Sequence, residues 1–340
     1  MQRKAEQAMM EQSTGRIEYY DIAKAYLIFL VIIGHVLNVI NPGYAKLHFS
    51  VIQSFISAFH MPAFFILHGV LFNNEKWRKR SVKEFILKRV YTLIIPYLFF
   101  EIIGIIWKWI LGSQDVLTGL YNIVTIRCNI GADWFLPAMF MGSLLYLIYV
   151  KFTNRICGVV SVLISFILPM FMGGNQFLIV VGRGLLAYGF IMIGHVVREF
   201  LKSEHTKSIF NIILALLITG AMAVISLKWG NNDFYTCIIN TPVVFLIGGG
   251  SGTYLIVGIS RLFQCKVLSC IGRHTLTIMG THQLFIYALS DVLLQNINQD
   301  VAVGIILLLI IIVLDIPVVF ILDRYLPFLV GRKSSIYLGK

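Results

Sequence analysis

The segment YDIAKAYLIFLVIIGHVLNVI, residues 20–40, decides the fold class. As a helix, this apolar run is long enough to cross about 30 Å of hydrocarbon. It also carries two side chains that hydrocarbon disfavours, Lys24 and His35. Because the run is longer than the apolar core of a cleavable signal peptide, we expect it to stay in the membrane as an anchor.

The rest of the chain has the same character. Of 340 residues, 58% are hydrophobic and 13% are charged, whereas a soluble domain has about 45–50% apolar and about 25% charged residues. A cytosolic enzyme, a secreted disulfide scaffold, a disordered tail and a coiled coil are all disfavoured, and the runs are too long for β-barrel strands. The sequence predicts an all-α polytopic membrane protein with about ten transmembrane helices, near residues 20–40, 51–72, 90–111, 134–150, 156–172, 177–197, 209–227, 242–260, 274–294 and 301–322.

Basic residues are unevenly distributed among the loops. Most of the 28 Lys and Arg residues lie at the ends of the spans that also include both termini, whereas the opposite loops hold only Lys46, Arg127 and Lys228. Positive charge accumulates in cytoplasmic loops, so we expect both termini to be cytoplasmic. The domain prediction is a cytoplasmic segment 1–19, an integral-membrane domain 20–322 and a cytoplasmic tail 323–340. The net charge of +12 therefore reflects membrane topology and not nucleic-acid binding.

The longest basic loop follows the second predicted span, over residues 73–89. One interpretation is a topology signal that also attracts anionic membrane lipids. The other is a docking surface for a polyanionic cytoplasmic ligand. The two are compatible, and the first needs fewer assumptions.

Ionisable side chains within spans are costly and are functional candidates by default. At 1.5 Å per residue, His35, His60 and Arg183 lie roughly 8, 14 and 9 Å below the outer surface. Asp133 begins the fourth span at the same boundary, beside Trp134. These groups from four spans are predicted to converge in the outer half of the membrane.

Each group also has a purely structural interpretation. His35 follows Gly34 and can hydrogen-bond between helices, His60 can satisfy a carbonyl near Pro62, and Arg183 can neutralise Asp133. Two deep histidines and an arginine together exceed what packing needs, so chemistry is favoured for His35, and the two interpretations are balanced for His60. Histidine suits proton transfer because its ordinary pKa is about 6.5. No metal site is expected, since no third ligand has suitable spacing.

Several motifs, in order, resemble those of the acyltransferase 3 family of bacterial membrane proteins. They include Asp21-Ile22-Ala23-Lys24 with Gly34-His35, Phe59-His60-Met61-Pro62 with Phe64-Phe65, Lys88-Arg89, Trp134-Phe135-Leu136-Pro137, Arg183-Gly184, and Ile271-Gly272-Arg273 with His282. The wording of the first two is most similar to the branch that contains fucose 4-O-acetylase and nodulation-factor acetylases.

The resemblance implies a ten-helix O-acyltransferase of the bacterial plasma membrane. Its donor would be cytoplasmic acyl-CoA, usually acetyl-CoA, and its acceptor a hydroxyl of a sugar or cell-envelope glycan. The family's basic-x10-His motif maps onto Lys24 and His35, with His35 as the catalytic histidine. The family's Arg-x-x-Arg motif maps onto Arg89 to Thr92, where the second arginine is absent, and His68 replaces the usual serine.

The residues suggest a division of roles within this framework. Cationic side chains are suited to the phosphates of CoA, and the candidates are Lys24, Lys88, Arg89, Arg78 and Lys79. His35 would be the general base, or alternatively form a transient acyl-histidine. His60 would orient His35 or the acceptor, and Arg183 would stabilise the oxyanion. The candidates for acceptor binding are Asp133, Trp134 and Glu101.

Two other functions stay open from the sequence. One is a transporter or flippase in which the intramembrane His and Arg side chains line a path. The other is a non-catalytic subunit that keeps the fold. We find no internal repeat of the kind that marks many secondary transporters.

Overall fold

The computed structural model describes residues 17–230, 232–293 and 301–332, and this part of the chain is helical without a strand. An isolated bridge pairs Asp233 with Ile238 in one loop. The helices, with η for short 3-10 or π segments, are α2 (Glu18–Ile40), η1 (Pro42–Tyr44), α3 (Leu47–Ser57), α4 (His60–Leu71), α5 (Asn74–Lys79), α6 (Val82–Arg89), η2 (Val90–Ile94), α7 (Ile95–Ile110), α8 (Val116–Thr125), η3 (Gly131–Trp134), α9 (Phe135–Phe152), α10 (Arg155–Ile167), η4 (Leu168–Phe171), α11 (Gln176–Val196), α12 (Arg198–Lys202), η5 (Glu204–Lys207), α13 (Ile209–Trp229), α14 (Pro242–Leu262), α15 (Lys266–Arg273), α16 (Thr275–Leu293) and α17 (Val301–Tyr325).

The all-α membrane fold predicted from composition is confirmed. Within the described residues, 8 helical segments are long and apolar enough to cross a membrane. The two remaining predicted spans are also helical: the fifth is a shorter apolar helix over Ile156–Phe171, and the ninth is the 19-residue α16. The orientation of the termini stays a prediction, and residues 1–16 and 333–340 of the two predicted tails lie outside the described residues.

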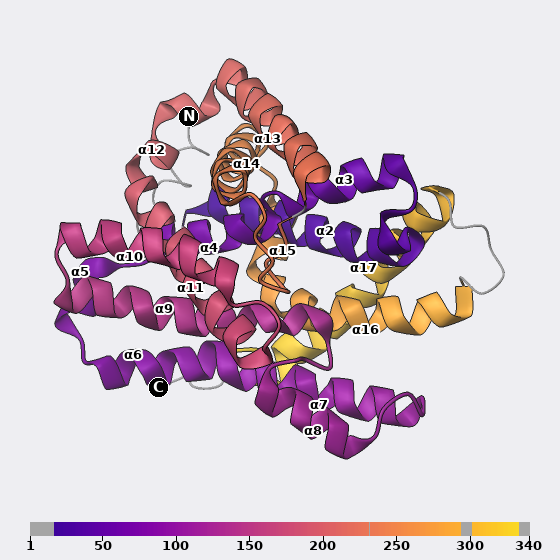
Figure 1. The fold of residues 1–340 in the computed structure, drawn as a ribbon. Helices are drawn as coiled ribbons and strands as arrows, with labels where there is room; N and C mark the ends of the chain where they lie inside the picture. The colour runs from indigo at the N-terminus through magenta and orange to yellow at the C-terminus, as the bar shows by residue number, and fades with distance from the viewer. Residues whose placement is uncertain (1–16, 231, 294–300, 333–340) are drawn as a thin grey trace.

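The helices form a bundle in which α13 lies at one edge and the α7–α8 hairpin at the opposite edge (Figure 1). Between these edges, α2, α4, α9 and α16 supply the interior faces used below (Figure 1). We name the two ends of the bundle after α2, which runs from the Lys24 end to the His35 end.

The second span is broken in the middle, between α3 and α4. Pro62 explains the break, because its ring has no N–H and clashes with the carbonyl one turn earlier. His60 therefore begins a new helix, and its Nδ1 donates to the carbonyl oxygen of Ile56 at 2.7 Å. The break turns an apolar span into one that presents a histidine ring at membrane depth.

Helices α4 and α11 approach each other at two glycines. A Cβ atom on Gly69 would overlap the carbonyl of Ile191, and one on Gly194 would overlap the carbonyl of Ile66. Small residues let backbones pack closely where hydrocarbon offers no hydrophobic driving force between helices. These reciprocal contacts hold α4, the second half of the broken span, in place.

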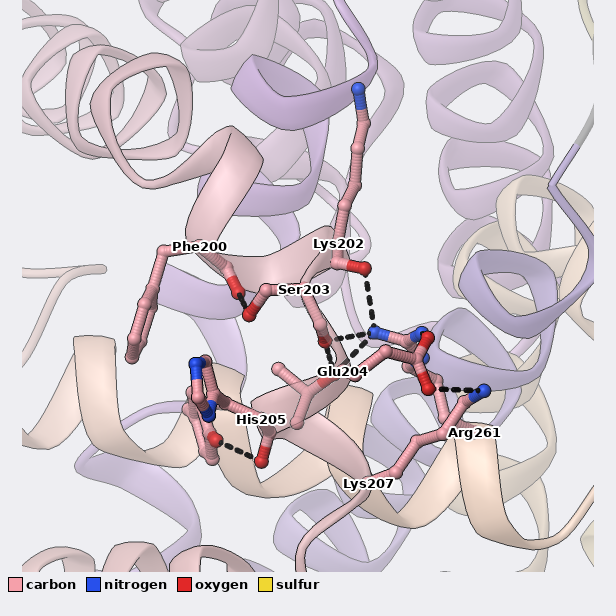
Figure 2. A network of polar contacts seen from close by, with 9 residues as sticks. Phe200, Lys202, Ser203, Glu204, His205, Lys207 and Arg261 are labelled. Atoms are coloured by element: carbon pink, nitrogen blue, oxygen red, sulfur yellow. Dashed lines mark hydrogen bonds and ion pairs between the residues drawn. The ribbon is translucent and has the colours of Figure 1, made fainter.

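Arg261 ties the end of α14 to the loop that joins α11 to α13. Figure 2 shows its guanidinium among the carbonyls of Lys202 and Ser203 and the carboxylate of Glu204. Lys207 also pairs with Glu204 at 2.8 Å. The hydrogen bond from Lys207 and the nearby Arg261 lower the pKa of Glu204 below its ordinary value. The loop is thereby held by a side chain of α14 and by an ion pair within η5.

We predict that Gly194→Ala destabilises the protein by about 1–3 kcal/mol, because backbone atoms of α4 cannot yield to the new methyl group. The matched control is Gly220→Ala in α13, where a Cβ would meet open space. That change should be neutral or stabilise by up to about 1 kcal/mol, since alanine favours a helix. Thermal unfolding in detergent measures both, and equal midpoints for the two variants would contradict the packing argument.

Candidate functional site

A cavity of about 760 Å³ surrounds His35. Its walls come from α2, α3, α4, η3, α16 and the loop between α13 and α14. His35, His60 and Trp134, three of the residues predicted from the sequence, line it together. Its polar and aromatic lining also includes Asn38, Gln53, Asn232, Asp233, Tyr235, Thr236, Asn240, Gln283 and Tyr287.

Two histidines, His35 and His60, line this cavity, and His282 packs against His35 outside the lining. The structure fixes the tautomers of His60 and His282. A carbonyl oxygen only accepts, so the Nδ1 atoms that contact Ile56 and Ile278 at 2.7 Å must carry the proton. In neutral His60 and His282, Nε2 is therefore an acceptor. His282 is fully buried, and its Nε2 has no hydrogen-bond partner among the described residues. Its ring centroid lies 5.3 Å from that of His35.

Arg183 lies outside the lining of the cavity and anchors the loop over residues 232–240, which forms part of the cavity wall. It is 3% exposed and is not among the lining residues. Its Nε donates to the carbonyl of Tyr235 at 2.6 Å and its Nη1 to that of Ile126 at 3.2 Å. The guanidinium also stacks on the rings of Tyr235 and Trp134, at 4.4 and 5.6 Å from their centroids. The Arg183 guanidinium therefore anchors two loops and the two aromatic rings of the cavity wall, those of Trp134 and Tyr235.

The predicted contact of Asp133 with the acceptor is not supported by its position. Asp133 is fully buried, and neither carboxylate oxygen has a hydrogen-bond partner among the described residues. The suggested neutralisation by Arg183 is not seen either, because no ion pair joins the two within the part of the chain that the structure describes. Its neighbours Ala132 and Trp134 line the cavity, and Asp133 does not.

Glu101 also differs from the prediction that it binds the acceptor. It is fully buried in α7. Its oxygens accept from the backbone N–H groups of Asn129 and Ile130 at 2.6 and 3.2 Å and from the Asn129 side chain at 2.9 Å. These bonds brace the turn that leads into η3. Its part in the site is therefore indirect.

A second cavity, of about 270 Å³, opens at the Lys24 end. Lys24, Arg89, His68 and Arg273 provide its polar lining, together with Thr275 at the first residue of α16. Arg89 Nη2 donates to His68 Nε2 at 3.0 Å. His68, which stands where the family motif has a serine, thus supplies a hydrogen-bond partner for Arg89.

Local packing explains why these cations meet. Gly272 lets α15 lie directly on α2, since a Cβ there would overlap the carbonyl of Asp21. Arg273 follows it and reaches the side of α2 that carries Lys24, whose Nζ lies 3.1 Å from an oxygen of Asp21. The start of α16 adds the positive end of a helix dipole. The arrangement is suited to an anion.

The other predicted CoA-binding residues lie outside this cavity. Lys88 stacks over the Trp77 ring at 5.4 Å, and Arg78 Nε donates to the carbonyl of Val150 at 3.2 Å. Lys79 is exposed on the short helix α5. Thr92 donates to the carbonyl of Lys88 at 3.0 Å and is half-buried. These residues flank the site without lining it.

Much of the lining of the His35 cavity was not predicted from the sequence. Gln283 and Tyr287 follow Met279 at four-residue spacing on α16, so the three share one face. Polar residues within an apolar span were the available signal. The loop over 232–240 gave no such signal, because its place over the cavity depends on Arg183, 49 or more residues earlier in the chain, bonding to a loop carbonyl.

Comparison of the sequence with known proteins identifies the family. The model of the acyltransferase 3 family, described as an acyltransferase domain, matches residues 17–324. The chain is 25% identical over 288 residues to nodulation protein NolL of Mesorhizobium japonicum, which covers 79% of this chain and 74% of that protein. No solved structure matches the chain significantly. The resemblance predicted from the motifs is therefore confirmed, and the chain belongs to the acyltransferase 3 family of membrane acyltransferases.

Proposed function

We propose that this protein transfers an acetyl group from cytoplasmic acetyl-CoA to a hydroxyl of a sugar or cell-envelope glycan. One observation carries the proposal: a cation-lined cavity and a histidine-lined cavity lie along the same four spans, α2, α4, η3–α9 and α16. A polyanionic donor and a polar acceptor can thus approach from opposite ends of the bundle.

The donor enters at the Lys24 end. Lys24, Arg89 and Arg273 attract phosphate groups, and the fork of arginine suits their oxygens. A cavity of about 270 Å³ is too small for a whole CoA molecule. The adenine nucleotide therefore stays outside, near Arg78, Lys79 and Lys88, while the narrow pantetheine arm enters.

The acceptor occupies the His35 cavity. Trp134, Tyr235 and Tyr287 offer flat aromatic faces, and amide side chains such as that of Gln283 offer hydrogen bonds. A few placed polar groups among aromatic surfaces are typical of a small-molecule site. Many hydroxyls on a sugar match this lining better than an apolar acceptor would.

The transfer itself is an acyl substitution. The acceptor oxygen bonds to the thioester carbonyl carbon while a ring nitrogen of His35 takes the hydroxyl proton. The carbon–sulfur bond then breaks, and the CoA thiolate takes the proton from His35. The products are an ester and CoA thiol. Arg183 acts as a positioning residue that keeps Trp134 and Tyr235 in place.

The Lys24 end faces the cytoplasm of a bacterial plasma membrane in this proposal. Acetyl-CoA is cytoplasmic and cannot cross hydrocarbon because of its phosphates. The excess of Lys and Arg in the loops at that end supports this orientation. The acceptor cavity then opens toward the opposite side, where envelope glycans are exposed.

His35→Ala should lower acetyl transfer by about 10²–10⁴-fold, because general-base catalysis contributes about that factor. Purified protein in mild detergent, radiolabelled acetyl-CoA and a cell-envelope glycan fraction provide the assay, with CoA release and label in the glycan as readouts. The control is His48→Ala, since His48 is exposed on α3 and lines none of the described cavities. Wild-type turnover by the His35 variant would overturn the assignment.

His282→Ala should lower kcat by about tenfold and leave KM for acetyl-CoA nearly unchanged. The buried Nε2 acceptor beside His35 is suited to hold a His35 N–H, which aims the other nitrogen at the acceptor. His282→Gln, which keeps an acceptor at the end of the side chain, should restore most of kcat. Steady-state kinetics of both variants test this positioning role, which fails if Ala and Gln lower kcat equally.

Arg89→Ala should raise KM for acetyl-CoA by about 10–100-fold, since a charged hydrogen bond contributes about 1.5–3 kcal/mol. The KM of Arg89→Lys should fall between those of Arg89→Ala and the wild type, because lysine keeps the charge but loses the forked guanidinium. The matched control is Arg80→Ala, whose side chain is half-exposed, pairs with Glu84 and lines no described cavity. Equal KM values for Arg89→Ala and Arg80→Ala would argue against donor binding at Arg89.

A further inference from the structure

One residue lines both cavities. Met279 of α16 borders the His35 cavity on one side and the Lys24 cavity on the other, and it is the one residue shared by the two within the described part of the chain. Its side chain is 3% exposed. The boundary between donor and acceptor cavities therefore passes through this side chain.

Neighbouring helices complete the boundary on both sides of Met279. On α4, Met61 borders the acceptor cavity and Phe64 the donor cavity; on η3–α9, Trp134 and Phe135 do the same. The four helical segments α2, α4, η3–α9 and α16 thus each line both cavities, and on each segment the positions that line the two lie within one or two turns. The two cavities are therefore separated by a short wall of side chains.

The wall has a rigid part and an adaptable part. The Phe135 ring packs on those of Phe64 and Phe65 at centroid distances of 5.6 and 4.9 Å. Aromatic rings packed against one another in a core have little freedom. Met279 has an unbranched side chain with three rotatable bonds, and such a side chain adapts its shape at low cost. It is the part of the wall that can move aside.

We propose that Met279 sets the length of acyl chain that passes from the donor cavity to His35. This inference rests on the proposed function and adds the class of donor that the protein accepts. A two-carbon acyl group presents one methyl group to the Met279 side chain as the thioester advances. Each further methylene has to enter the space that the Met279 thioether occupies, so short-chain acyl-CoA is preferred.

The test compares acetyl-, butyryl- and hexanoyl-CoA as donors for wild type, Met279→Ala and Met279→Trp. Met279→Ala should raise kcat/KM for butyryl-CoA relative to acetyl-CoA by about tenfold or more, since one methylene in a shaped apolar pocket discriminates by at least about tenfold. Met279→Trp should lower acetyl transfer strongly and still bind CoA in an equilibrium binding assay, because the cationic lining of the donor cavity is unchanged.

Met192→Ala is the matched control. Met192 is also buried, on α11, and lines none of the described cavities. It should leave the chain-length preference as in wild type, which separates a specific effect from a loosened core. If Met279→Ala is poorly folded, Met279→Val and Met279→Trp still bracket the size of the side chain.

The outcomes separate the two proposals. A folded wild type that consumes none of the three donors overturns the proposed function and this inference with it. A wild type that transfers acetyl groups, with Met279→Ala keeping the wild-type order of donors, overturns the role of Met279 alone. A relaxed preference in Met279→Ala but not in Met192→Ala supports it.

Discussion

The cost of placing polar groups in hydrocarbon is the constraint on which the rest of this structure depends. His35, His60, Lys24 and Arg89 lie in or beside membrane-length helices, where exposure to lipid would be unfavourable. They are tolerated because they face the interior of the bundle or its ends. The same constraint that buries them also gathers them, so two polar cavities form within an otherwise apolar protein.

Backbone geometry then decides what these groups can do. Pro62 interrupts the second span and allows the His60 side chain to satisfy a carbonyl of its own helix break. Glycines at positions 69, 194 and 272 bring α4 against α11 and α15 against α2. Without these close approaches, Arg273 would not reach the side of α2 that carries Lys24. These glycines thus determine where the charged side chains of the Lys24 cavity meet.

The separation of the two cavities has a chemical consequence. CoA carries its charge at one end and its reactive thioester at the other, so its binding and its reaction need different surroundings. A cationic site near one end of the bundle and an imidazole deeper inside meet both needs along the same helices. In the proposed mechanism, the short wall at Met279, which lines both cavities, separates the thioester from the acceptor until the acyl group advances.

The sequence by itself determined the membrane fold, the family and the identity of the central polar side chains. It could do so because apolar length, charge in loops and an ionisable residue inside a span are local properties, readable at His35, His60 and Lys24. The roles of Arg183, Asp133 and Glu101 could not be read in this way. The position of a residue along its helix predicts its depth in the membrane. It does not predict which sides of two helices face each other.

Only the tertiary structure decided those faces. Arg183 donates to carbonyls of two distant loops, and Glu101 accepts from the backbone of a turn. Asp133 is fully buried and lies outside the lining of the His35 cavity. The pairing of His35 with His282 likewise joins α2 to α16 across most of the chain. Such contacts depend on how helices rotate and cross in the bundle, and that is set by the packing of all of them together.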